Sequence, residues 1–116
     1  MATKERLEYI YSLLNEVLPN KVYYALYVED NAEVPFIVYQ EISKNPKTYA
    51  DDLYLLKQIT IQITLVTKNK DVVLEGKLED ALDLAGIDFR LISEYPLIDT
   101  GIHRIYEIKM EEFKNE

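Results

Sequence analysis

The tripeptide Asp99-Thr100-Gly101 comes closest to a catalytic motif. It follows an apolar pair, Leu97-Ile98, and an apolar strand leading into Asp-Thr-Gly is how an aspartic protease presents its catalytic carboxylate. Two such aspartates share one proton, because adjacent like charges do not both ionise cheaply, so this chain would have to dimerise. Only 15 residues follow Gly101, too few for the rest of a protease barrel. We expect a turn between strands, with Gly101 at positive φ.

Carboxylates cluster at two further places, and carboxylate oxygens can bind calcium or magnesium. One place is the pair Asp51-Asp52, and the other is a run inside a predicted helix. Neither has the D-x-D-x-D-G spacing of a calcium loop. Helical carboxylates at i, i+4 repel slightly and are typical of a solvated face, or of a partner surface. The helical residues are Glu75, Glu79, Asp80 and Asp83.

Histidine and cysteine offer little further chemistry. The chain has no cysteine, which excludes disulfides, thiol catalysis and cysteine-based metal sites. Its one histidine, His103, makes no triad or metal group by itself, and we expect it at the surface or on an edge strand. Phosphate-binding glycine loops are missing from the sequence. We therefore expect no catalytic residue, no metal and no cofactor.

The composition indicates one globular domain over residues 1–116. Hydrophobic residues make up 48% and charged residues 29% of the chain, without low-complexity tracts. The formal net charge of -8 opposes binding to nucleic-acid phosphates. The acidity can serve solubility alone, form a surface for a basic partner, or repel DNA. No apolar run reaches the roughly 18 residues of a membrane span, and the start MATKERLEY is charged where a secretory signal is apolar. We expect synthesis in the cytosol and no membrane partner.

Two amphipathic helices are predicted. Residues 4–18 place apolar side chains at helical spacing, and Pro19 ends this helix. Residues 71–85 repeat the pattern, with Asn69 or Asp71 as the N-cap and Gly86 as the stop. A glycine inside the second helix costs about 1 kcal/mol relative to alanine, so this helix must gain its stability from packing.

Strands are predicted at residues 21–28, 35–43, 59–65, 87–94 and 102–113. The first two are separated by a polar break and predict a hairpin. The third alternates Ile or Leu with Thr or Gln, which indicates one buried and one wet face of an antiparallel sheet. A polar loop is expected at 43–52. The order α-β-β-β-α-β-β predicts an α+β domain with a mainly antiparallel sheet and two helices packed on one face.

Tyrosine is unusually frequent, with ten residues and no tryptophan. Its ring packs while its hydroxyl stays wet, which suits protein interfaces, although aromatic residues also favour strands. Tyr24 and Tyr39 of the first two predicted strands are candidate contacts. The 43–52 loop exceeds the length of a tight hairpin and adds Tyr49, Asp51 and Asp52 as candidates for subunit or partner contact.

Four features follow one another over nearly the whole chain. They are an N-terminal helix, the Val34-Pro35-Phe36-Ile37-Val38 entry to a strand, the polar 43–52 loop before a long Thr/Ile strand, and a closing strand after Asp99-Thr100-Gly101. By this pattern the chain resembles the tail terminator and tail-completion proteins of long-tailed bacteriophages, which include tail-to-head joining proteins.

That resemblance implies a structural protein of the virion and not an enzyme. Such a subunit forms a ring with copies of itself, usually a hexamer, on the head-proximal end of the tail tube. The ring stops tube polymerisation and docks on the head connector, so its partners are the major tail protein and head connector proteins. Assembly takes place in the host cytoplasm. DNA passes through the ring, and an acidic lumen would repel it, whereas a lumen lined with Lys and Arg would contradict this expectation.

Two other functions stay open at the level of sequence. The first is an acidic binding or inhibitor domain, similar to immunity proteins, that neutralises a basic partner by electrostatic complementarity. It would be a strict monomer, whereas the phage role requires a ring of about six subunits. The second is an acid-protease dimer, in which Asp99→Asn would abolish peptide cleavage.

Overall fold

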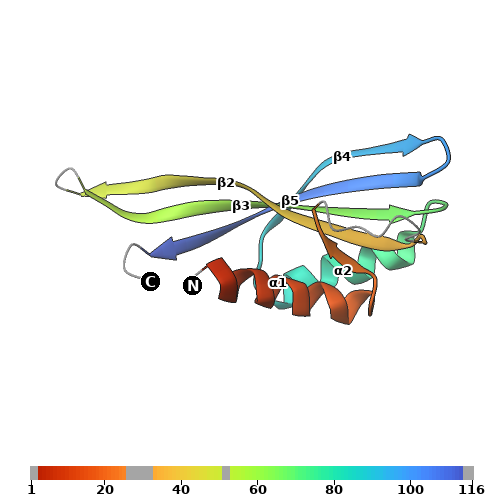
Figure 1. Cartoon of the computed structure of the whole chain (residues 1–116), viewed down its shortest axis with the longest axis horizontal. Helices are drawn as coiled ribbons and strands as arrows, with labels where there is room; N and C mark the ends of the chain where they lie inside the picture. The colour runs from red at the N-terminus through yellow and green to blue at the C-terminus, as the bar shows by residue number, and fades with distance from the viewer. Residues whose placement is uncertain (1–2, 26–32, 51–52, 114–116) are drawn as a thin grey trace.

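The two helices lie on one face of a five-stranded sheet (Figure 1). The computed structural model describes residues 3–25, 33–50 and 53–113. The order of its elements is α-β-β-β-α-β-β, which confirms the predicted α+β fold. The elements are α1 (Thr3–Val17), β1 (Val22–Tyr24), β2 (Phe36–Ala50), β3 (Leu53–Thr67), α2 (Val72–Leu84), β4 (Phe89–Leu97) and β5 (Gly101–Phe113).

The strands are arranged in the order β1-β2-β3-β5-β4. All neighbours are antiparallel except β1, which runs parallel to β2 with Val22 opposite Ile37. The predicted hairpin of the first two strands is therefore wrong. Alternation of apolar residues specifies which side chains face the core and is the same for either strand direction. It places Val22 and Tyr24 toward the core without saying which way β1 runs.

The β2–β3 hairpin is much longer than predicted. The residues of the expected 43–52 loop belong to β2 as far as Ala50, and Asp51 and Asp52 lie outside the described residues. Pro46 stands opposite Lys57 in the ladder, next to a register shift. Because β1 pairs with β2 only as far as Tyr39, the outer edge of β2 has no further described partner strand, and a proline without an N–H is tolerated there.

The core lies between the sheet and the helices. Its centre is the Ile59, Ile61 and Ile63 series of β3, fully buried as the alternation predicts. The opposite face is less wet than predicted, because Thr60 and Val66 are buried too. Side chains on neighbouring strands cover this face; Lys109 Nζ, for example, donates to Thr60 Oγ1 over 3.3 Å.

The ends of α2 follow the predicted signals. Asp71, and not Asn69, is the N-cap, and its side chain accepts a hydrogen bond from the Leu74 N–H over 3.0 Å. Gly86, at φ 73°, follows the helix in the left-handed conformation that glycine adopts without strain. The next strand extends further at its C-terminal end than the predicted range 87–94. β4 continues through Tyr95 and Pro96, which were expected to link two strands, and ends at Leu97.

Candidate interaction surfaces

Arg6 of α1 is buried at the centre of an ion cluster that joins α1 to the sheet. Its guanidinium donates to Glu112 of β5 over 2.9 Å and to Glu41 of β2 over 3.0 Å. Lys44 Nζ lies 3.1 Å from the same Glu112 carboxylate, and Thr3 Oγ1 accepts from Arg6 over 3.2 Å. These five residues are the Arg6 cluster. Hydrogen bonds from Arg6 and then Lys44 hold the pKa of Glu112 below its ordinary value.

Arg104 of β5 is the centre of a second cluster, which joins α2 to β4 and β5. It donates to Glu94 over 3.0 Å and to Glu79 over 3.1 Å. Lys70 Nζ bridges Glu75 (2.7 Å) and Glu94 (3.0 Å). Hydrogen bonds from Lys70 and then Arg104 lower the pKa of Glu94. The Arg104 cluster consists of Lys70, Glu75, Glu79, Glu94, Arg104 and Tyr106.

Tyr106 is the most deeply buried member of the Arg104 cluster. Its hydroxyl donates to Glu79 Oε2 over 2.6 Å and accepts from Arg104 Nε. Burial first, and the bond to Glu79 second, raise the pKa of Tyr106 above its ordinary value. The phenol therefore stays protonated and keeps donating to Glu79.

The Arg104 cluster corrects the prediction that the α2 carboxylates mark a solvated face. Glu75 is buried, and Glu79 faces the sheet, because basic side chains of β5 and of the segment before α2 pair with them. Only Asp80 and Asp83 are exposed. One signal was available in the sequence: Glu75 and Glu79 share a helix face with the core residues Leu78 and Leu82.

Tyr24 and Tyr39, two candidate interface residues, pack against each other on the helix-covered face. Their rings meet edge to face with centroids 5.1 Å apart, and the Tyr24 hydroxyl accepts the Glu41 N–H over 3.3 Å. Tyr39 is 7% exposed. Burial, followed by the nearby Tyr24 and Tyr11, raises its pKa. Both serve the core, and their interface role stays a prediction.

Tyr39 also forms the floor of a hollow beside α1. The hollow has a volume of about 510 Å³. Leu7 and Tyr11 give it apolar walls, and Lys4 and Glu8 add one charge of each sign. We call it the α1 hollow; its lining residues are Lys4, Leu7, Glu8, Tyr11, Ser12 and Tyr39.

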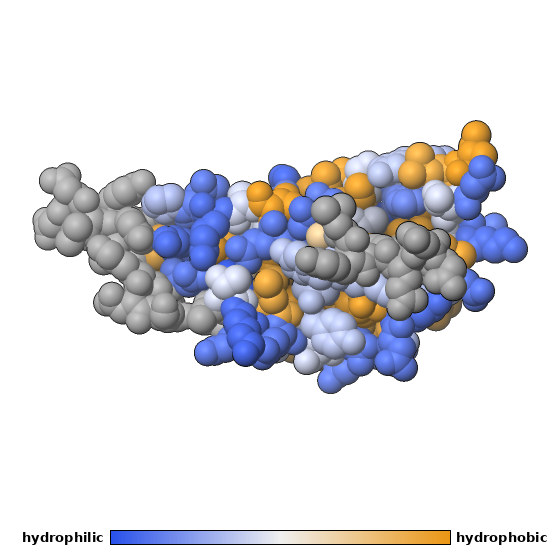
Figure 2. Space-filling view, in the orientation of Figure 1, coloured by the Kyte–Doolittle hydropathy of each residue, from blue (hydrophilic) through white to orange (hydrophobic). Residues whose placement is uncertain are grey.

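The turn between β4 and β5 lies at the upper right of the molecule in Figure 1. Leu97, Ile98 and Asp99 form what we call the β4–β5 tip. Figure 2 shows apolar surface at the β4–β5 end of the molecule, in orange at the upper right. Asp99 has φ 74° and Gly101 has φ 101°, so the expected turn is confirmed. His103 lies beside it on β5, an internal strand and not an edge, and stacks on Tyr95 at 5.5 Å.

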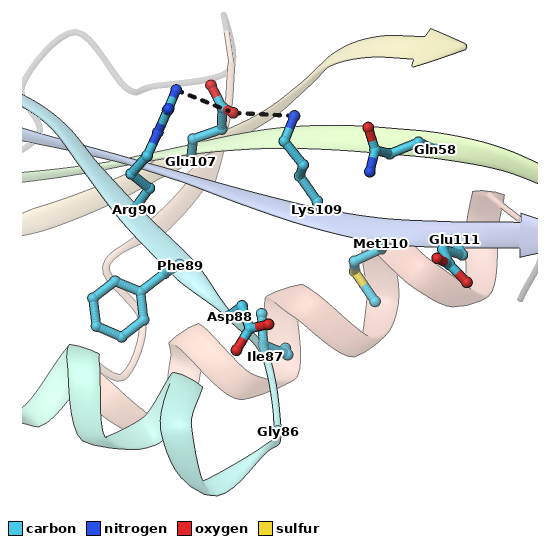
Figure 3. A pocket seen from close by; sticks show the side chains of 10 residues that line it. All are labelled: Gln58, Gly86, Ile87, Asp88, Phe89, Arg90, Glu107, Lys109, Met110 and Glu111. Carbon is cyan, nitrogen blue, oxygen red and sulfur yellow. Dashed lines mark ion pairs between the residues drawn. The ribbon is translucent and has the colours of Figure 1, made fainter. Parts of the chain in front are cut away.

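A notch of about 610 Å³ lies where β4 begins and β5 continues past it, paired only with β3 (Figure 3). Arg90 and Lys109 flank Glu107 at its upper side, at 3.8 Å and 3.2 Å. Asp88 and Glu111 add two more carboxylates. Because the two cations already pair with Glu107, their positions do not define a site for an anion.

Of the remaining candidates, only Tyr49 falls within the described residues, near the far end of the β2–β3 hairpin. Tyr49 pairs with Tyr54 in the ladder, but its side chain is outside the described residues, as are Asp51 and Asp52 entirely. Within the described ranges, no group of three or more His, Asp or Glu side chains is placed to hold a metal ion. The helices described here are also too short or too polar to cross a membrane.

Comparison of the chain with protein-family models and with curated proteins gives no match.

Proposed function

We propose that this chain is a structural subunit of a long-tailed phage or prophage, which caps the tail tube as a ring and forms the head-joining surface. The proposal joins the whole-chain resemblance to an architecture that offers several assembly surfaces. These are the long hairpin, two sheet edges, the α1 hollow and the β4–β5 tip.

The β2–β3 hairpin is the observation that carries the proposal. Pairing between β3 and β5 ends at Leu56 opposite Phe113, so beyond this point the described ladder contains only two strands, which pair as far as Ala50 opposite Leu53. An isolated two-stranded ribbon is marginally stable in water. A neighbouring subunit or the tail tube would supply the missing contacts.

The charge of the helical layer supports passage of DNA without adhesion. The exposed charged residues of the helices are five acidic ones (Glu5, Glu8, Glu16, Asp80, Asp83) and two basic ones (Lys4, Lys77), whereas Glu75, Glu79 and Arg6 face the sheet. A wall of this net charge repels DNA phosphates. We therefore place the helical layer toward the lumen of the proposed ring.

Deletion of the gene tests the function directly. We expect tail tubes of uncontrolled length and heads that fail to join tails, both seen by electron microscopy and both restored by the wild-type gene. Neighbouring genes for capsid, connector and major tail protein are also expected. Normal tails after deletion, or flanking metabolic genes, would contradict the proposal.

A variant tests the hairpin separately. Tyr49→Ala combined with Asp51→Ala should impair assembly on the tail tube and head joining, because Tyr49 lies near the end of the described ribbon and Asp51 is the next residue in sequence after Ala50, where the described part of β2 ends. Tyr9→Ala with Asp88→Ala, at two exposed positions outside the hairpin, is the matched control. Normal joining by the hairpin variant would remove the hairpin as the contact.

A further inference from the structure

The β4–β5 tip exposes apolar side chains that find no cover within the described chain. Ile98 is 92% exposed and Leu97 is 45% exposed. Single exposed apolar residues are common, but adjacent ones at the end of a hairpin suit insertion into a partner.

The tip is also held in one conformation. The Thr100 N–H donates to the Leu97 carbonyl over 3.3 Å, and Thr100 Oγ1 lies 3.0 Å from His103 Nε2. A Cβ at Gly101 would lie 2.1 Å from the Thr67 carbonyl oxygen, so only glycine fits there. A rigid tip loses little conformational entropy when it binds.

The α1 hollow has the complementary properties. Leu7, Tyr11 and Tyr39 provide apolar surface, and its volume of about 510 Å³ accommodates two aliphatic side chains. A small apolar projection fits a hollow of this size and lining, and the β4–β5 tip presents one.

The charges beside the two surfaces also match. Lys4 and Glu8 line the hollow, while Asp99 and Lys68 flank the tip, where the Lys68 Cα lies 3.2 Å from a Cβ built at Gly101. All four side chains are exposed, and none forms an ion pair with another described residue. Docking would set Lys4 against Asp99 and Glu8 against Lys68.

We propose that the β4–β5 tip of one copy docks in the α1 hollow of a second copy. The hollow is formed by α1 and β2 and the tip by β4 and β5, and β2 and β4 are separated in the sheet by β3 and β5. The contact is therefore head to tail: the first copy keeps a free hollow and the second copy keeps a free tip. Contacts of this kind close into rings or extend as filaments; closure into a ring rests on the proposed function, whereas the pairwise contact does not.

Two substitutions block the two halves of the contact. Ile98→Asp places a charge on the tip, and Ser12→Arg fills the hollow. Both positions are exposed, so the unfolding midpoint should not change. Val73→Asp on α2 and Glu16→Arg on α1 are matched controls at exposed positions outside the two surfaces.

Sedimentation velocity of the purified chain over a wide concentration range provides the readout. We expect the wild type and both controls to associate, and each blocked variant to associate about thirtyfold more weakly. An equimolar mixture of the two blocked variants should form dimers and nothing larger, because it contains one intact tip and one intact hollow per pair. A monomeric wild type, or blocked variants that associate normally, would overturn the inference.

A charge exchange tests the register of the contact. Glu8→Lys and Lys68→Glu should each weaken association about tenfold through like-charge contacts, and the double variant should recover it. Double-variant association no stronger than that of the single variants would show that this charge pairing is wrong and would overturn the proposed orientation. Gene deletion that disrupts tails while Ile98→Asp virions assemble normally would refute the contact and leave the function standing. If tails are normal after gene deletion but association of the purified chain still depends on the tip, the proposed function is refuted and the contact is retained.

Discussion

The Arg6 and Arg104 clusters use the same chemistry in different surroundings. Each places an arginine between a helix and the sheet, Arg6 from α1 toward β2 and β5, and Arg104 from β5 toward α2 and β4. The Arg6 side chain is 0% exposed, whereas that of Arg104 is 15% exposed. The carboxylates around Arg104 also have other donors, Lys70 and Tyr106.

We therefore expect the fold to depend on Arg6 and to tolerate the loss of Arg104. Without Arg6, Glu41 and Glu112 lose a donor fixed by burial, and Lys44 reaches only Glu112. Without Arg104, Lys70 still binds Glu75 and Glu94, and Tyr106 still binds Glu79. The first four of the five predictions that follow test this contrast, and the fifth concerns the α2 helix beside the Arg104 cluster.

Arg6→Met should have the largest effect. Breaking a buried ion pair by removing one partner typically costs about 3–5 kcal/mol, because a charge is left without compensation. The free energy of unfolding from urea titration measures the loss. Arg90→Met, at a side chain 74% exposed, is the control and should cost about 0–1 kcal/mol. Adding Glu41→Gln and Glu112→Gln to Arg6→Met should recover part of the loss, because the carboxylates left without Arg6 are then neutral. Equal losses of unfolding free energy in Arg6→Met and Arg90→Met would refute the contrast.

Arg104→Met should destabilise the protein less, by about 1–3 kcal/mol, the range for lost hydrogen bonds to charged groups. Lys70 limits the loss, so adding Lys70→Met should cost more than the sum of the two single effects. The same urea titrations measure this coupling. A loss from Arg104→Met equal to that from Arg6→Met would show that the additional donors contribute nothing.

Both clusters should lose stability in acid. The pKa values of Glu112 and Glu94 are lowered in the folded state, so their contribution is complete above the unfolded pKa of about 4.3 and is lost as pH falls through the lower folded values. Urea midpoints measured across this range should fall, and Glu112→Gln should flatten the curve. An unchanged slope in Glu112→Gln would exclude this glutamate as a source of acid sensitivity.

Tyr106→Phe should cost about 1 kcal/mol, since it removes one hydrogen bond to Glu79 and keeps the buried ring. Arg104 continues to bind Glu79, which limits the loss. Tyr95→Phe, whose hydroxyl makes no hydrogen bond with the described residues, is the matched control. Thermal unfolding should separate the two variants, and identical midpoints would remove Tyr106 from the cluster.

Gly76→Ala should stabilise α2, on the Arg104 side of the molecule, by about 0.5–1 kcal/mol. A Cβ at this position meets no atom within 4 Å, so the gain in helix propensity is not offset by a clash. A rise in the unfolding midpoint is expected. A decrease would indicate a contact at this position that the isolated chain does not show.

Local patterns in the sequence determined the helices, the two candidate caps of α2 (of which the structure uses Asp71), the stop at Gly86 and the buried Ile series of β3. Each depends on residues a few positions apart, through helix or strand periodicity or hydrogen bonds within one turn. The Asp-Thr-Gly turn was predictable for the same reason.

Tertiary structure alone decided the direction of β1, the length of the β2–β3 hairpin and the partners of the charged residues. Arg6 lies 106 positions before Glu112, and no local pattern relates two residues that far apart. Glu75 and Glu79 looked solvated because their cations come from other elements. Periodicity specifies which face of an element is buried; only the packed chain specifies which charges meet there, because burial is favourable for a charge only beside its partner.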